Sequence, residues 1–90
     1  MANFYLIAVD KDKDTTALHN FIDSSPMFIN WWHYISSAYI VKTNDNLAGV
    51  QAALQRNWPN NRYLLIKVDP TYRDGWLNPE AYQWFRDNAN

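Results

Sequence analysis

Near its start, the chain has a run of six apolar residues, Phe4 to Val9, that is followed by Asp10. A short, continuous apolar run of this length is typical of a strand with both faces covered. Because successive side chains of a strand point to opposite faces, the run predicts a sheet that needs cover on its front and on its back. A chain of 90 residues has room for one domain to meet that need.

Three other segments have the pattern of helices. Apolar residues recur at helical spacing in 15–23 and in 47–54. Near the end of the chain, Asn78-Pro79-Glu80 is a strong helix start, with a cap, a proline in the first turn and an acid near the positive helix end. We expect Asn44 to cap the second of these helices.

Two segments are rich in the aromatic and β-branched residues that favour strands. INWWHYISSAYIVKT (29–43) predicts two strands around a central turn, and RYLLIKV (62–68) predicts a fourth strand. The resulting order predicts an α+β, ferredoxin-like βαββαβ fold, with a four-stranded antiparallel sheet, two helices on one face and a C-terminal helix. We expect residues 1–90 to form a single domain, with a core of about 3–70 and an extension of 71–90.

The sheet is predicted to be apolar on both faces, whereas its two crossover helices cover only one. Five Trp, six Tyr and four Phe supply enough aromatic surface for a core and for an interface. Either the C-terminal helix or a second copy covers the second face, and we favour a symmetric homodimer because twofold dimers are the commonest oligomers. The expected interface residues are Tyr5, Ile7, Trp31 and Tyr39.

The composition limits the cellular location and the classes of partner that we expect. The chain has no cysteine, which excludes disulfides and thiolate metal sites. It has no long apolar run, so we expect a cytoplasmic protein without membrane contact. The formal net charge is -1 with both signs mixed along the chain. A nucleic-acid partner therefore requires a local basic patch, or one that a second subunit completes.

Several stretches resemble small ferredoxin-like proteins related to CRISPR-associated Cas2, and in particular their SinR-like relatives. YLIAVD (5–10) is similar to the first strand of Cas2, which ends in an aspartate. HYISSAYIV (33–41) resembles the segment in which a serine leads into an aromatic third strand. WWHYISSAYIVKT (31–43), and the tryptophan and helix in 75–85, look especially like the SinR-like version. The resemblance covers most of the chain.

This resemblance implies a homodimer associated with nucleic acid, either a weak divalent-metal-dependent nuclease or a non-catalytic relative. In Cas2-like proteins, the first-strand aspartates of two subunits approach the dimer axis and hold a divalent metal. Only Asp10 matches that catalytic position, and with Asp12 it is the expected ligand of a Mg²⁺ ion. The acidic DKDKD loop (10–14) and the absence of basic residues beside the first helix depart from the family pattern.

The alternating aspartates Asp10, Asp12 and Asp14 have other interpretations. Their spacing fits the first ligands of an EF-hand calcium loop, but Thr15 stands where glycine is needed and Phe21 where a glutamate is needed. The interpretation that we favour is structural. In it, Asp10 ends the strand, Asp14 or Thr15 caps the first helix, and the loop is kept soluble by its charges.

Trp32, His33 and Arg62 are candidate binding residues, since aromatic rings stack on nucleobases and arginine pairs with phosphate. Trp31 and Trp32 point to opposite faces of a strand, so they cannot both belong to one platform. For His33, a hydrogen bond within the sheet is the simpler interpretation. The alternative function is a non-enzymatic interaction module or inhibitor, such as a phage or mobile-element protein that binds and blocks another protein. The aromatic content and near-neutral charge suit this alternative equally.

Overall fold

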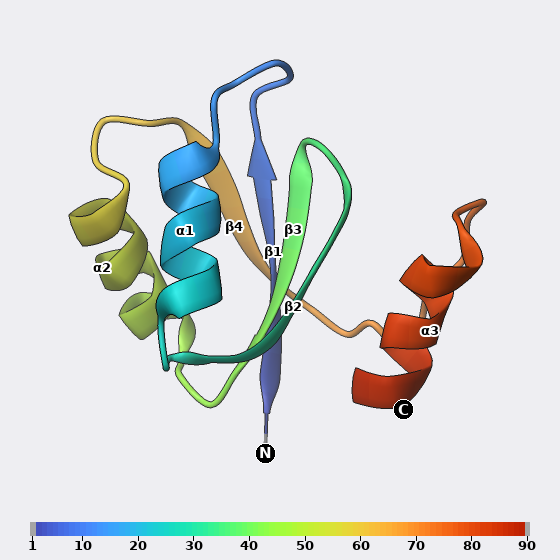
Figure 1. The fold of residues 1–90 in the computed structure, drawn as a ribbon. Coiled ribbons are helices and arrows are strands. Elements are labelled where there is room, and N and C mark those ends of the chain that lie inside the picture. The colour runs from blue at the N-terminus through green and yellow to red at the C-terminus, as the bar shows by residue number, and fades with distance from the viewer. Residues whose placement is uncertain (1, 90) are drawn as a thin grey trace.

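The structure, a computed structural model, describes residues 2–89, which form one antiparallel sheet and three helices (Figure 1). The strands are β1 (Asn3–Val9), β2 (Phe28–Ile35), β3 (Ala38–Thr43) and β4 (Tyr63–Val68). The helices are α1 (Thr16–Ser24), α2 (Leu47–Asn57) and α3 (Pro79–Asn88). The sheet order is β2-β3-β1-β4, so the α+β architecture is broadly ferredoxin-like, as predicted. In the described part of the chain, no helix has the length and apolar character needed to cross a membrane.

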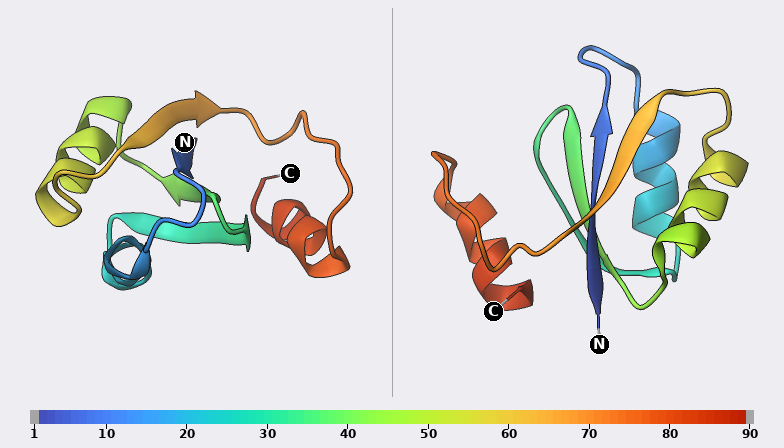
Figure 2. Two further views of the ribbon diagram at one scale, coloured as in Figure 1. Left: turned by 90° about the horizontal axis from the view of Figure 1, so that it is seen from above. Right: turned by 180° about the vertical axis from the view of Figure 1, so that it is seen from behind.

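The crossover helices α1 and α2 cover one face of the sheet and form the main core there (Figure 2). Alternate residues of the central strands point to this side, among them Tyr5 and Ile7 of β1 and Tyr39 and Val41 of β3. The helices face them with the buried side chains Leu18, Ile22, Val50 and Leu54. The predicted helical stripes therefore supply the cover of this face, as periodicity at 3.6 residues requires.

The prediction of the dimer-interface residues is not confirmed by the buried face of the sheet. Tyr5, Ile7 and Tyr39 were expected at a dimer interface, but all three are buried beneath α1 and α2. Trp31 also lies on the helix side, half-buried, with its ring centroid 5.0 Å from that of His19 of α1. The alternation of a strand separates its two faces, but when both faces are apolar it does not tell which of them the helices cover.

The C-terminal helix α3 lies against the other face of the sheet, beside β2 and β3 (Figure 2). The buried indole of Trp32 donates from Nε1 to the carbonyl of Ala81 at 3.1 Å, and its ring lies 5.5 Å from that of Phe85. Lys42 of β3 donates from Nζ to the carbonyl of Asn88 at 2.9 Å. The second face is therefore covered by the chain's own helix, over β2 and β3.

On this face, apolar side chains are half-buried along β1 and exposed along β4. The register pairs Leu6 with Ile66 and Ala8 with Leu64, which places these four side chains in two neighbouring rows. Leu64 is 54% exposed and Ile66 is 43% exposed. We call these four residues the open strip. Monomeric proteins rarely expose large contiguous apolar patches, so the open strip is a candidate interface.

Of the three helices in residues 2–89, only α2 has an N-cap residue whose side chain accepts a capping hydrogen bond. Asn46 accepts a hydrogen bond on Oδ1 from the backbone N–H of Gly49 at 2.8 Å and thereby caps α2. The prediction that Asn44 caps this helix is wrong, because residues 44 and 45 turn the chain out of β3. The N-cap residue of α1 is Thr15, whose side chain makes no capping hydrogen bond; Asp14, the residue before it, accepts a hydrogen bond from the backbone N–H of Thr16 at 3.0 Å.

Candidate functional site

Asp10 and Arg62 meet where β1 ends and β4 begins. The register pairs Val9 with Tyr63, so the residue after β1 lies beside the residue before β4. Arg62 donates from Nε to one carboxylate oxygen of Asp10 at 3.1 Å and from Nη2 to the other at 2.9 Å. Both side chains remain exposed to solvent. The planar guanidinium thus holds the carboxylate in a bidentate ion pair.

This ion pair sets the protonation of both groups. Hydrogen bonds from Arg62 are the main reason that the pKa of Asp10 lies below its ordinary value. Slight desolvation opposes this shift, while the charges of Arg62 and Lys13 add to it. The same hydrogen bonds raise the pKa of Arg62. A general base works best with a pKa near the operating pH, so this environment favours Asp10 as a permanent anion rather than as a proton acceptor.

The carboxyl of Asp10 is expected to titrate below the ordinary aspartate value of about 3.9, and its midpoint is expected to rise towards that value in Arg62→Gln. Because the folded-state pKa is lowered, the ion pair stabilises the fold above that ordinary value and loses its effect as the pH falls through the folded-state pKa. The measurement is the carboxyl carbon shift of Asp10 by NMR against pH, with Lys67→Gln as a charge-matched control. Equal midpoints in the wild type and Arg62→Gln would contradict the ion pair.

The other aspartates of the loop do not join Asp10 in a metal site. Asp12 is exposed and adopts a left-handed backbone conformation, with φ at 63°. Asp14 accepts hydrogen bonds from the backbone and the hydroxyl of Thr16, which lower its pKa. Within residues 2–89, no three acidic or histidine side chains are grouped so that they could hold a metal ion. Asp10 and Asp12 therefore have no third side-chain ligand in the described part of one chain, and a Mg²⁺ ion at this position would complete its coordination with water or with groups of a second copy.

The predicted aromatic binding residues have structural roles. Trp32 is buried beneath α3, so the prediction that it binds a ligand is wrong. The ring of His33 stacks on that of Tyr39, with centroids 3.8 Å apart and planes 2° apart. Nδ1 of His33 lies 3.1 Å from the carbonyl of Ala38, and because a carbonyl only accepts, this nitrogen carries the proton. The simpler interpretation of His33 is thus supported.

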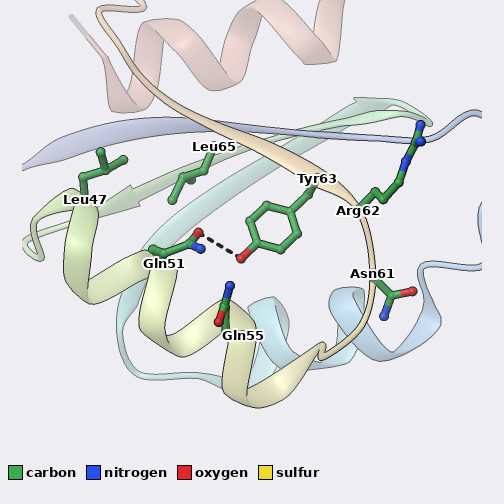
Figure 3. Close-up of a pocket in the computed structure, with 7 residues that line it drawn as sticks. All are labelled: Leu47, Gln51, Gln55, Asn61, Arg62, Tyr63 and Leu65. Atoms are coloured by element: carbon green, nitrogen blue, oxygen red, sulfur yellow. Dashed lines mark hydrogen bonds between the residues drawn. The ribbon is translucent and has the colours of Figure 1, made fainter.

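A groove runs between α2 and β4, with a volume of about 420 Å³ (Figure 3). Leu47, Gln51 and Gln55 recur every fourth residue and form its helical wall. Tyr63 and Leu65 line it from alternate positions of β4, and the hydroxyl of Tyr63 donates to Oε1 of Gln51 at 2.9 Å. Sequence reasoning missed this groove, although the polar row of α2 beside its apolar stripe was a signal for it.

Comparison of the chain with family models, with curated proteins and with solved structures gives no match. The class that the structure defines is a small α+β domain with a four-stranded antiparallel sheet. Its candidate functional features are the Asp10–Arg62 ion pair, the open strip and the groove beside α2.

Proposed function

We propose that this chain is a non-catalytic binding protein that works as a homodimer, related in its ferredoxin-like fold to the Cas2-like and SinR-like proteins. The observation that carries the proposal is the open strip on the back of the sheet, formed by Leu6, Ala8, Leu64 and Ile66. The strip contains no charged side chain, whereas charged groups are usual on a solvated sheet face. Its apolar surface favours a protein partner over a phosphate backbone.

Charge complementarity makes a second copy the favoured occupant of the strip. A shallow hollow of about 260 Å³ is lined jointly by Ala8 and Leu64 of the strip and by Asp10 and Arg62. In a twofold dimer, each contact between two different residues occurs twice. A copy packed face to face on the strip, related by a twofold axis that runs parallel to the strands between β1 and β4, places β1 of each chain over β4 of the other. This arrangement brings Arg62 of one chain towards Asp10 of the other, so each negative group faces a positive one.

The Asp10–Arg62 ion pair favours a non-catalytic role for the proposed dimer. Arg62 binds both carboxylate oxygens of Asp10 and holds its pKa low. A Mg²⁺ ion would have to displace two charge-assisted hydrogen bonds before it could use this carboxylate. In the proposed dimer Asp10 is a structural anion at the end of the interface.

A divalent-metal-dependent nuclease is the second candidate function. The observation in its favour is the position of Asp10, which shares a hollow with the open strip. A twofold axis near that hollow would bring two copies of Asp10 together and double the carboxylates available to a Mg²⁺ ion. Nuclease chemistry then needs this shared site, because the described part of one chain does not group enough ligands.

Sedimentation equilibrium of the wild type, Ile66→Lys and Ile29→Lys tests the dimer. Both substitutions place a lysine at an exposed apolar strand position, but only Ile66 belongs to the open strip. The wild type and Ile29→Lys are expected to dimerise, and Ile66→Lys to raise the dimer dissociation constant about 100-fold or more. A wild type that stays monomeric, or an Ile66→Lys variant that dimerises like the wild type, would overturn the proposal.

Incubation of the wild type and Asp10→Asn with DNA and RNA, in Mg²⁺ or Mn²⁺, separates the two candidate functions. The non-catalytic proposal expects no cleavage above the background without protein. Cleavage by the wild type that Asp10→Asn abolishes, while the variant still dimerises, would replace it with the nuclease. The dimerisation control excludes loss of activity through loss of assembly.

A further inference from the structure

The two edges of the sheet differ in how they are protected. The β2 edge is interrupted by register shifts between Phe28 and Asn30 and between Trp32 and Ile35, and α3 packs beside it. The β4 edge pairs with β1 through six consecutive residue pairs without a shift. Natural proteins usually blunt free edges with bulges, prolines or covering elements, because a regular edge is a template for another strand. β4 contains neither a bulge nor a proline, and Lys67 is its one charged residue.

The groove lies directly along this regular edge. Its helical wall, Leu47, Gln51 and Gln55, stands on one side, and Tyr63 and Leu65 of β4 stand on the other (Figure 3). A strand added to β4 would point alternate side chains into this groove. The groove offers apolar contact at Leu47 and Leu65 and amide hydrogen bonding at Gln51 and Gln55.

We propose that β4 and the groove beside α2 bind an extended segment of a partner protein, which adds to the sheet as a fifth strand and carries at least one acidic side chain. Main-chain hydrogen bonds to the free edge supply affinity that is independent of sequence, and the groove selects alternate side chains. This site lies on the edge and the helix side of β4, whereas the open strip lies on the opposite face; Arg62, at the start of β4, borders both surfaces.

The charged side chains around the groove favour an acidic residue in the bound segment. Arg62 is the one charged side chain among the seven residues that line the groove, and no acid lines it. A guanidinium has five N–H donors, and Asp10 takes two of them through Nε and Nη2. Lys67 lies further along the same strand. An acidic side chain on the added strand can therefore accept hydrogen bonds from the three remaining N–H groups of Arg62 or pair with Lys67.

Selection from a displayed library of random decapeptides, with the full chain as bait, tests the site. The enriched peptides are expected to alternate apolar residues and to include Asp or Glu. A synthetic copy of the most enriched peptide is then titrated into isotope-labelled protein. We expect shift changes at Leu65, Gln51 and Gln55, and slower amide hydrogen exchange in β4.

Two isosteric variants distinguish an effect of charge inside the groove from an effect of the protein's net charge. Gln51→Glu keeps the oxygen that accepts from Tyr63 but adds a negative charge inside the groove, and it should weaken peptide binding about tenfold or more. Asn20→Asp makes the same charge change on the exposed face of α1 and should alter binding less than twofold. Ile66→Lys should bind the peptide like the wild type, which keeps this result distinct from the dimer test.

Four outcomes would overturn the site. The first is a selection that enriches no peptide beyond an unrelated bait, and the second is an enriched set without acidic residues. The third is equal peptide binding by Gln51→Glu and the wild type. The fourth is protection of β4 amides in the Ile66→Lys variant that rises with protein concentration alone, because this variant lacks the strip dimer and the protection would show that a second copy occupies the edge.

Discussion

Replacement of Trp32 by alanine is expected to lower the free energy of unfolding by about 3–5 kcal/mol. The side chain is 3% exposed, and it is the main anchor between the sheet and α3. Its loss removes the ring contact with Phe85 and leaves the carbonyl of Ala81 without its indole donor. Because both contacts belong to α3, we expect this helix to lose its protection against hydrogen exchange before the rest of the fold does.

Urea unfolding followed by circular dichroism measures the change, and Trp76→Ala is the matched control. Trp76 is 98% exposed in the segment before α3, so the same substitution there should change stability by no more than about 0.5 kcal/mol. If Trp32→Ala costs less than about 1 kcal/mol, or leaves the exchange rates of α3 unchanged, then Trp32 does not anchor this helix.

Replacement of Thr43 by valine is expected to cost about 1–3 kcal/mol, although the two side chains have the same shape. Thr43 is fully buried at the end of β3. Its hydroxyl donates to the carbonyl of Met27 at 2.8 Å and accepts from the backbone N–H of Asp45 at 3.1 Å. Valine opens no cavity but leaves both backbone groups without a hydrogen-bond partner. The hydrogen bonds that connect the α1–β2 loop to the turn before α2 are then lost.

Thermal and urea unfolding of Thr43→Val and Thr71→Val test this role. Thr71 is exposed, and its hydroxyl makes only a long 3.5 Å hydrogen bond to the carbonyl of Ala89. We expect Thr71→Val to remain within about 0.5 kcal/mol of the wild type. Equal effects of the two substitutions would show that the hydrogen bonds of Thr43 add no net stability.

The candidate site shows where sequence reasoning stops. Asp10 was singled out because it ends an apolar strand, and Arg62 because arginine pairs with phosphate. Nothing in the sequence joined them, since they are 52 residues apart. Their contact depends on the β1–β4 register, which arises only when the sheet assembles. That contact changes the chemistry expected of Asp10 from that of a free metal ligand to that of a paired anion.

The sequence by itself determined the type and order of the elements. Local backbone preferences, alternation along strands and helical spacing are written in neighbouring residues, so β1, α2 and the Asn78-Pro79 start of α3 were all predictable. Only the tertiary structure decided which face of β1 the crossover helices bury, how much of the other face α3 covers, and which charges meet. These outcomes depend on packing between segments far apart in the chain, where two apolar faces are equivalent until a helix occupies one of them.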